Sequence, residues 1–99
     1  MAKDTGQPGI QFEISLTGRP NGQLRAAYIR LRKAKVVRTK EVVQDTVMAD
    51  YDSRDQLIGI EILGPVQIQV LTELVDSRDR SAFRRFAQDN IPIALREVA

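Results

Sequence analysis

The fold class of this chain is indicated most clearly by one segment, Ile10-Gln11-Phe12-Glu13-Ile14-Ser15-Leu16-Thr17. Its apolar residues alternate with polar ones throughout, which is the period of a β-strand with one buried face. The sequence that follows, Gly18-Arg19-Pro20-Asn21-Gly22, offers a proline for the first part of a turn and a glycine for a positive φ. We therefore predict a strand followed by a hairpin that returns antiparallel.

Further strands are expected along most of the remaining chain. Residues 24–32 and 57–63 alternate again, with polar turn residues at 52–55. Residues 36–43 are β-branched and charged with blurred alternation, which suits an edge strand or one with both faces partly covered, and residues 46–52 are expected to form a shorter strand. Beyond Gly64-Pro65, apolar residues again alternate with glutamines over residues 66–70, which predicts a short sixth strand.

The apolar period changes to that of a helix after Leu71. We predict a helix over residues 78–89, capped by Ser77 and ended by Asn90. The apolar stripe consists of Leu74, Val75, Ala82, Phe83, Phe86 and Ala87. Because a sheet with one apolar face needs a cover, the sequence predicts an α+β fold: an antiparallel β-meander of five or six strands with a C-terminal helix packed on one face.

The length and composition limit the remaining possibilities. With 99 residues, the chain is expected to form a single α+β domain over residues 10–99, after a flexible N-terminal tail at residues 1–9. A hydrophobic fraction of 42% beside 28% charged residues is typical of a globular protein. Neither a secretory signal nor a long apolar segment is evident, so we expect a cytoplasmic protein that does not enter a membrane.

Catalytic chemistry finds little support in the sequence. There is no cysteine and no histidine, which excludes disulfides, thiolate nucleophiles and Cys/His zinc sites. No glycine-rich phosphate loop is present, and the serines lack a histidine to activate them. We expect no enzyme activity and no cofactor.

A cluster of acidic residues resembles the outline of a calcium loop. Counting Asp50 as position one, Asp52 is position three and Glu61 is position twelve. However, Arg54 stands at a ligand position, and Asp55 occupies the place of the glycine that the loop requires. We interpret the cluster as hairpin residues, with Asp side chains bonded to the turn backbone and Glu61 facing a cross-strand base.

Charge is distributed unevenly along the chain. Residues 18–44 contain eight basic residues against one acid, and residues 45–63 contain five acids against one base. If these segments form neighbouring strands, cross-strand pairs neutralise much of the charge. The alternative is a basic surface for a partner or a nucleic acid, with the candidate residues Arg30, Arg32, Lys33, Lys35, Arg38 and Lys40. Only Tyr28 accompanies this surface as an aromatic residue, so we expect nucleic-acid binding to be weak.

Four segments in a fixed order resemble a known family. They are Ala27-Tyr28-Ile29-Arg30-Leu31, Thr39-Lys40-Glu41-Val42, Asp50-Tyr51-Asp52 and Leu57-Ile58-Gly59-Ile60-Glu61-Ile62-Leu63. Together, over about residues 24–66, the chain resembles the domain of unknown function 2283 (DUF2283), a family of small prokaryotic proteins. The resemblance implies a strand-rich fold and no established activity.

Two function classes follow from the sequence. The first is a protein-interaction module, either a homodimer or an antitoxin-like partner of another small protein. Its contact is expected at residues 10–16 if they form an open sheet edge, unless residues 91–98 cover that edge within the molecule. The alternative is a weak nucleic-acid-binding protein that uses the basic stretch 19–40.

Overall fold

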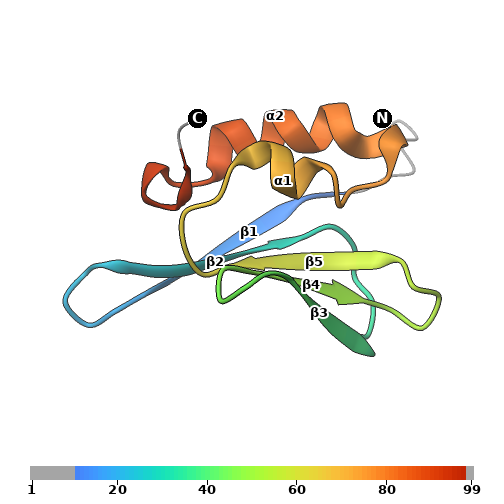
Figure 1. The fold of residues 1–99 in the computed structure, drawn as a ribbon, viewed down its shortest axis with the longest axis horizontal. Helices are drawn as coiled ribbons and strands as arrows, with labels where there is room; N and C mark the ends of the chain where they lie inside the picture. The colour runs from blue at the N-terminus through green and yellow to red at the C-terminus, as the bar shows by residue number, and fades with distance from the viewer. Residues whose placement is uncertain (1–10, 98–99) are drawn as a thin grey trace, which may run out of the picture.

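The computed structural model describes residues 11–97, which form an antiparallel sheet with helices on one face (Figure 1). The strands are β1 (Glu13–Gly18), β2 (Leu24–Arg30), β3 (Arg38–Val43), β4 (Val47–Tyr51) and β5 (Leu57–Ile62). The helices are α1 (Ile68–Thr72), the short 3-10 helix η1 (Ser77–Asp79), α2 (Arg80–Asn90) and the 3-10 helix η2 (Ile93–Leu95). The predicted α+β class, with an antiparallel sheet and a C-terminal helix, is confirmed.

The order of the strands differs from that of a sequential meander. The five strands lie in the order β1-β2-β5-β4-β3, and every neighbouring pair is antiparallel. The connection 31–37 therefore runs from β2 to the far edge of the sheet, and β5 returns to lie beside β2. This is the strand order of a Greek key added to the β1–β2 hairpin. Local alternation predicts each strand but cannot show which strands become neighbours.

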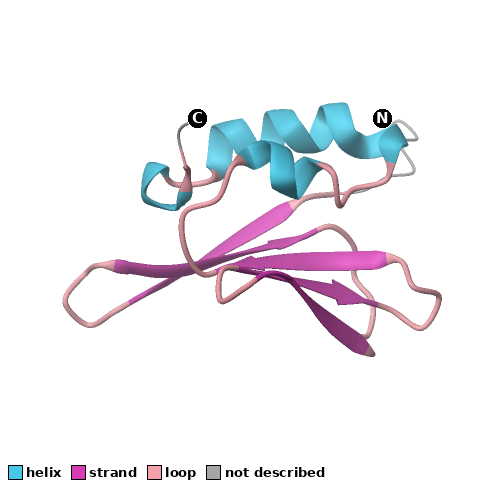
Figure 2. Cartoon of the chain, in the orientation of Figure 1, coloured by secondary structure: helices cyan, strands magenta, loops and turns pink. Residues whose placement is uncertain are grey.

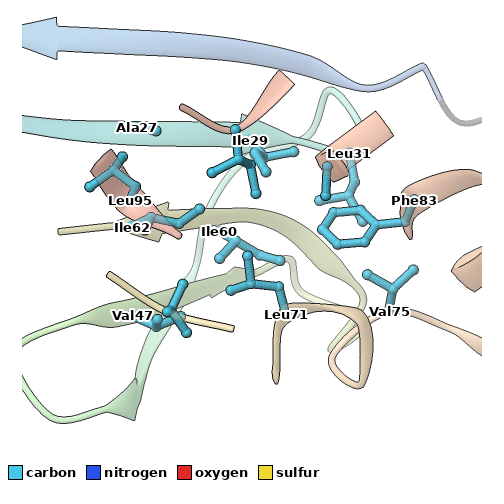
Figure 3. Packing of buried hydrophobic residues seen from close by; sticks show 13 residues of the cluster. Ala27, Ile29, Leu31, Val47, Ile60, Ile62, Leu71, Val75, Phe83 and Leu95 are labelled. Atoms are coloured by element: carbon cyan, nitrogen blue, oxygen red, sulfur yellow. The ribbon is translucent and has the colours of Figure 1, made fainter. Parts of the chain in front are cut away.

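The helix-facing side of the sheet forms the hydrophobic core. The register places Ile29 opposite Ile60 and Ala27 opposite Ile62, so that inward-facing residues lie in rows across the strands. Phe83 of α2 is fully buried against this face. Figure 3 shows its ring and the side chains of the central strands directed toward one another. The prediction that α2 covers the sheet is confirmed.

The predicted sixth strand is a helix instead. Only Val66 makes a β-bridge, and the chain then turns into α1 (Figure 2). Ile68, Leu71 and Val75 have helical spacing as well, so the segment satisfies both periods. The helix prevails because it places Leu71 in the core, and the turn that follows buries Val75 there as well.

The C-terminal segment does not run beside β1 within the described residues. The N–H of Val66 donates to the carbonyl of Leu95, and the N–H of Glu97 donates to that of Val66. Ile91 and Leu95 are buried in the core. The expectation that residues 91–98 cover the β1 edge is therefore wrong for the part of this segment that is described, residues 91–97.

The start of the C-terminal helix differs in detail from the prediction. Asp76, and not Ser77, accepts a hydrogen bond from the N–H of Arg78 and caps the 3-10 turn that precedes α2. The end agrees with the prediction, because α2 ends at Asn90, whose amide donates to the carbonyl of Phe86.

The predicted tail at residues 1–9 lies outside the described residues. Among residues 11–97, no helix has the length and hydropathy needed to cross a membrane.

Candidate interaction surface

Strand β1 forms one edge of the sheet, and its backbone pairing shows which groups are free. Just past β2, the N–H of Leu31 donates to the carbonyl of Ile58 at 2.7 Å. In an antiparallel pair, alternate residues direct both backbone groups to the same neighbour, so odd-numbered residues of β2 face β5 and even-numbered ones face β1. Since Ser15 lies opposite Tyr28, the odd-numbered residues of β1 are those bonded to β2.

The even-numbered residues of β1 therefore direct their N–H and C=O groups to the open edge. The hairpin supports the same assignment, because the N–H of Arg19, also odd-numbered, donates to the carbonyl of Gln23 at 2.7 Å. Ile14 and Leu16 thus present backbone groups that no strand in residues 11–97 pairs with. Such an edge is a template for another strand.

The side chains of β1 leave this edge with little protection. Leu16 lies opposite the core residue Ala27, on the helix-facing side of the sheet, yet it is 54% exposed. Glu13 is the strand's single charged residue, and it forms an ion pair of 3.0 Å with Arg30 of β2. The strand contains no proline. It therefore has neither the proline nor the several charges that often prevent pairing at a sheet edge, although its pairing with β2 is interrupted by a bulge between Thr17 and Gly18.

Strand β3, at the opposite edge, is protected by charge. Its sequence is Arg-Thr-Lys-Glu-Val-Val, with three charged residues among its six. Arg38 forms an ion pair with Asp55, and its guanidinium lies 4.7 Å from the centre of the Tyr51 ring. Charged edge residues discourage strand pairing because they would be desolvated by it. The two edges are therefore unequal, and β1 is the open one.

The six predicted basic residues do not share one face. Arg30 lies on the open face of the sheet and is paired with Glu13. Lys40 lies opposite the buried Ala49, which places it on the helix-facing side at the β3 edge. The remaining residues are Arg32, Lys33 and Lys35 of the connection 31–37, and Arg38 at the start of β3. Two of the six, Arg30 and Arg38, are thus engaged by carboxylates, and the other four are divided between the helix-facing side and the connection 31–37.

On the open face of the sheet, Tyr28 is bound tightly to its neighbours. Its hydroxyl donates to Asp50 at 2.9 Å, and Thr39 donates to the other oxygen of Asp50 at 2.6 Å. A Cβ on Gly59 would lie 2.0 Å from the Tyr28 hydroxyl oxygen, so the ring passes directly over this glycine. Burial, together with the hydrogen bond to Asp50, raises the pKa of Tyr28 to about 12. Sequence reasoning missed this arrangement, although the glycine inside a strand indicates a close approach.

The acidic hairpin is structural, as expected, apart from one residue. Asp52 accepts hydrogen bonds from the N–H groups of Gln56 and Arg54, and these bonds hold the pKa of its carboxyl below the usual value. The prediction for Glu61 is wrong, because its cross-strand neighbours are Tyr28 and Met48 rather than a base. Residues 11–97 contain no group of three or more acidic side chains placed to hold a metal ion.

One cavity of about 250 Å³ lies between the sheet and the segment that joins α1 to α2. Its lining includes the half-buried Tyr51 and Arg32, whose Nε has no hydrogen-bond partner among the residues that the structure describes. Asp55 and Asp76 also line it, but each is already paired with an arginine. The cavity therefore combines both signs of charge and offers no pair of free carboxylates for acid–base work.

The comparison with known families bears on the strand-rich part of the chain. Residues 26–64 match the family model described as "Protein of unknown function (DUF2283)". The chain resembles DUF2283. The resemblance expected from the sequence is thus confirmed. No curated protein and no solved structure matches the chain.

The matched segment corresponds to a definite part of the fold. It begins within β2 and ends two residues after β5, so it contains most of β2 and all of β3, β4 and β5, and it omits β1 and the helices. Tyr28, Asp50 and Gly59, which meet on the open face, all lie within it. The open edge strand β1 lies outside the DUF2283 segment.

Proposed function

We propose that this protein is an interaction module that binds a partner chain by adding a strand to β1. The observation that carries the proposal is the open edge itself, where the N–H and C=O groups of Ile14 and Leu16 face outward. The exposed side chain of Leu16 adds an apolar contact beside these groups. Main-chain hydrogen bonds supply affinity in strand addition, and the alternate side chains supply selectivity.

The contrast between the edges supports β1 as the binding edge. A partner strand at β3 would have to desolvate three charged residues, Arg38, Lys40 and Glu41, whereas at β1 it meets one, Glu13, which is paired with Arg30. The partner is either a second copy of this chain or another small protein. In the second case, this protein would act as an antitoxin-like partner. Both use the same edge.

The experiment compares the wild type with a Leu16→Lys variant. Leu16 is a better position than Ile14, because Ile14 packs against the core and its substitution would also perturb the fold. The control is Ile93→Lys, which removes another exposed apolar side chain, 81% exposed, from η2. Sedimentation velocity measures self-association, and affinity capture with a tagged chain measures binding of a partner.

We expect Leu16→Lys to weaken association at least about tenfold, while Ile93→Lys leaves it unchanged. A wild type that stays monomeric at high concentration, and captures nothing that depends on Leu16, would contradict the proposal.

Weak nucleic-acid binding by residues 19–40 is the alternative. Two of the eight basic residues in this stretch, Arg30 and Arg38, are engaged by Glu13 and Asp55, which lowers the charge that can neutralise phosphates. Tight binding of short RNA or DNA at physiological salt, lost in a variant with Arg30, Arg32 and Arg38 changed to Ala, would favour this alternative.

A further inference from the structure

We infer that the partner strand at β1 is β1 of a second copy, paired antiparallel about a twofold axis at Ser15. This inference rests on the proposed function and specifies its partner. The two five-stranded sheets would then join edge to edge into one continuous sheet.

The hydrogen-bonding pattern restricts the possible registers. Because the free backbone groups belong to the even-numbered residues of β1, a second β1 must place even-numbered residues opposite even-numbered ones. Two registers with this property give the longest overlap within Glu13–Gly18, one with its axis at Ser15 and one at Leu16.

The side chains favour the axis at Ser15. In this register Ile14 lies opposite the partner's Leu16, and the same contact occurs again on the other side of the axis. Both residues are on the helix-facing side, so each exposed Leu16 would be covered by an isoleucine that already packs against its own core. With the axis at Leu16, the two Leu16 residues would face each other, but each Ile14 would face the partner's Gly18, which has no side chain to contact it.

Charge is compatible with the same register. Glu13 would lie opposite the partner's Thr17, so the two carboxylates do not face each other. Each Glu13 also keeps its ion pair with Arg30 in its own subunit. On the axis, Ser15 would face the partner's Ser15 on the open face of the sheet, where two hydroxyl groups can bond to each other or to water.

The test uses the absence of cysteine from the natural chain. Ser15 directs its backbone to β2, so the two Ser15 residues would form a pair without mutual backbone hydrogen bonds, with Cα atoms about 4.5 Å apart. A disulfide needs a Cα separation of roughly 4.4 to 6.8 Å. A Ser15→Cys variant should therefore form a covalent dimer under mild oxidation, read by non-reducing electrophoresis.

Two matched controls define the register. Thr17→Cys alone should give little dimer, because in the proposed register its two copies are four residues apart along the strand, about 13 Å. Ser53→Cys, an exposed residue of the β4–β5 turn, reports random collision. We expect the yield of linked dimer to be at least about tenfold higher for Ser15→Cys than for either control.

The possible outcomes separate this inference from the proposed function. If the wild type is a dimer, and only a mixture of Ser15→Cys and Thr17→Cys is linked, the axis lies at Leu16 and the register proposed here is wrong. If Ser15→Cys shows no linkage beyond the Ser53→Cys level and the wild type is monomeric, the second copy is excluded. The proposed function would then depend on whether a different partner is captured through Leu16.

Discussion

The two faces of the sheet differ in what holds their side chains. On the helix-facing side, Ile29, Ile60 and Phe83 are fully buried and contact one another through apolar surface alone. On the open face, Tyr28 and Asp50 are half-buried and joined by a hydrogen bond. The first face supplies most of the folding free energy, because burial of apolar area is the larger contribution. On the open face, the hydrogen bond between Tyr28 and Asp50 depends on the close approach of the Tyr28 ring to Gly59.

The largest expected effect tests the helix-facing side. Phe83→Ala removes a buried ring and leaves a cavity beneath α2. This ring contacts Phe12 edge-to-face, with 5.7 Å between the ring centres. We expect the free energy of unfolding to fall by about 3 to 5 kcal/mol. Denaturant unfolding followed by circular dichroism measures this loss. A loss below about 1 kcal/mol would contradict the placement of α2 on the sheet.

A smaller effect is expected from Gly59→Ala on the open face. The new Cβ would meet the Tyr28 ring, so the ring must move and break its hydrogen bond to Asp50. We expect a loss of about 1 to 2 kcal/mol in the same unfolding measurement.

The control for this substitution is the same change in a Tyr28→Ala background. With the ring absent, Gly59→Ala should be neutral or slightly stabilising, because glycine in a strand costs about 0.5 to 1 kcal/mol relative to alanine. Equal losses in both backgrounds would show that the Tyr28–Gly59 contact is not the cause.

The smallest effect concerns the titration of Tyr28. Its pKa is raised from 10.0 to about 12, chiefly by burial and then by Asp50, so the folded state favours the neutral phenol. This contribution to stability is complete below about pH 10 and is lost as the pH rises through about 12.

Ultraviolet absorbance of a Tyr51→Phe variant isolates the phenolate of Tyr28. We expect its midpoint near 12 while circular dichroism still reports the folded state. Adding Asp50→Asn should lower the midpoint, because it removes the neighbouring negative charge. A midpoint near 10 in the folded Tyr51→Phe variant would contradict both the burial of the Tyr28 hydroxyl and its hydrogen bond to Asp50.

The candidate surface could be predicted only in part. The weak protection of residues 10–16 is visible in the sequence, as is the charge at residues 38–41. Which strands stand at the edges is not visible, because it depends on pairing between residues far apart in the chain. The basic residues of the stretch 19–40 show the reverse case, in which the sequence suggests a shared surface that the fold does not form. Arg30 and Lys40 belong to one run of charge in the sequence, but strand alternation and sheet order place them on different faces.

By itself, the sequence determined the local elements of this protein. Alternation predicted β1, Gly22 with its φ of 87° closes the predicted hairpin, and the helical stripe predicted the helix that carries Phe83. These features depend on residues a few positions apart, where side-chain period and backbone preference act directly.

Only the tertiary structure decided the rest. It determined the order β1-β2-β5-β4-β3, the helical state of residues 68–72 and the passage of the Tyr28 ring over Gly59. Each depends on a contact between distant parts of the chain. Residues 68–72 satisfy the periods of both a strand and a helix, and the helix prevails because it buries Leu71 against the sheet. Within residues 11–97, the same long-range pairing leaves β1 with β2 as its single neighbour and so creates the open edge.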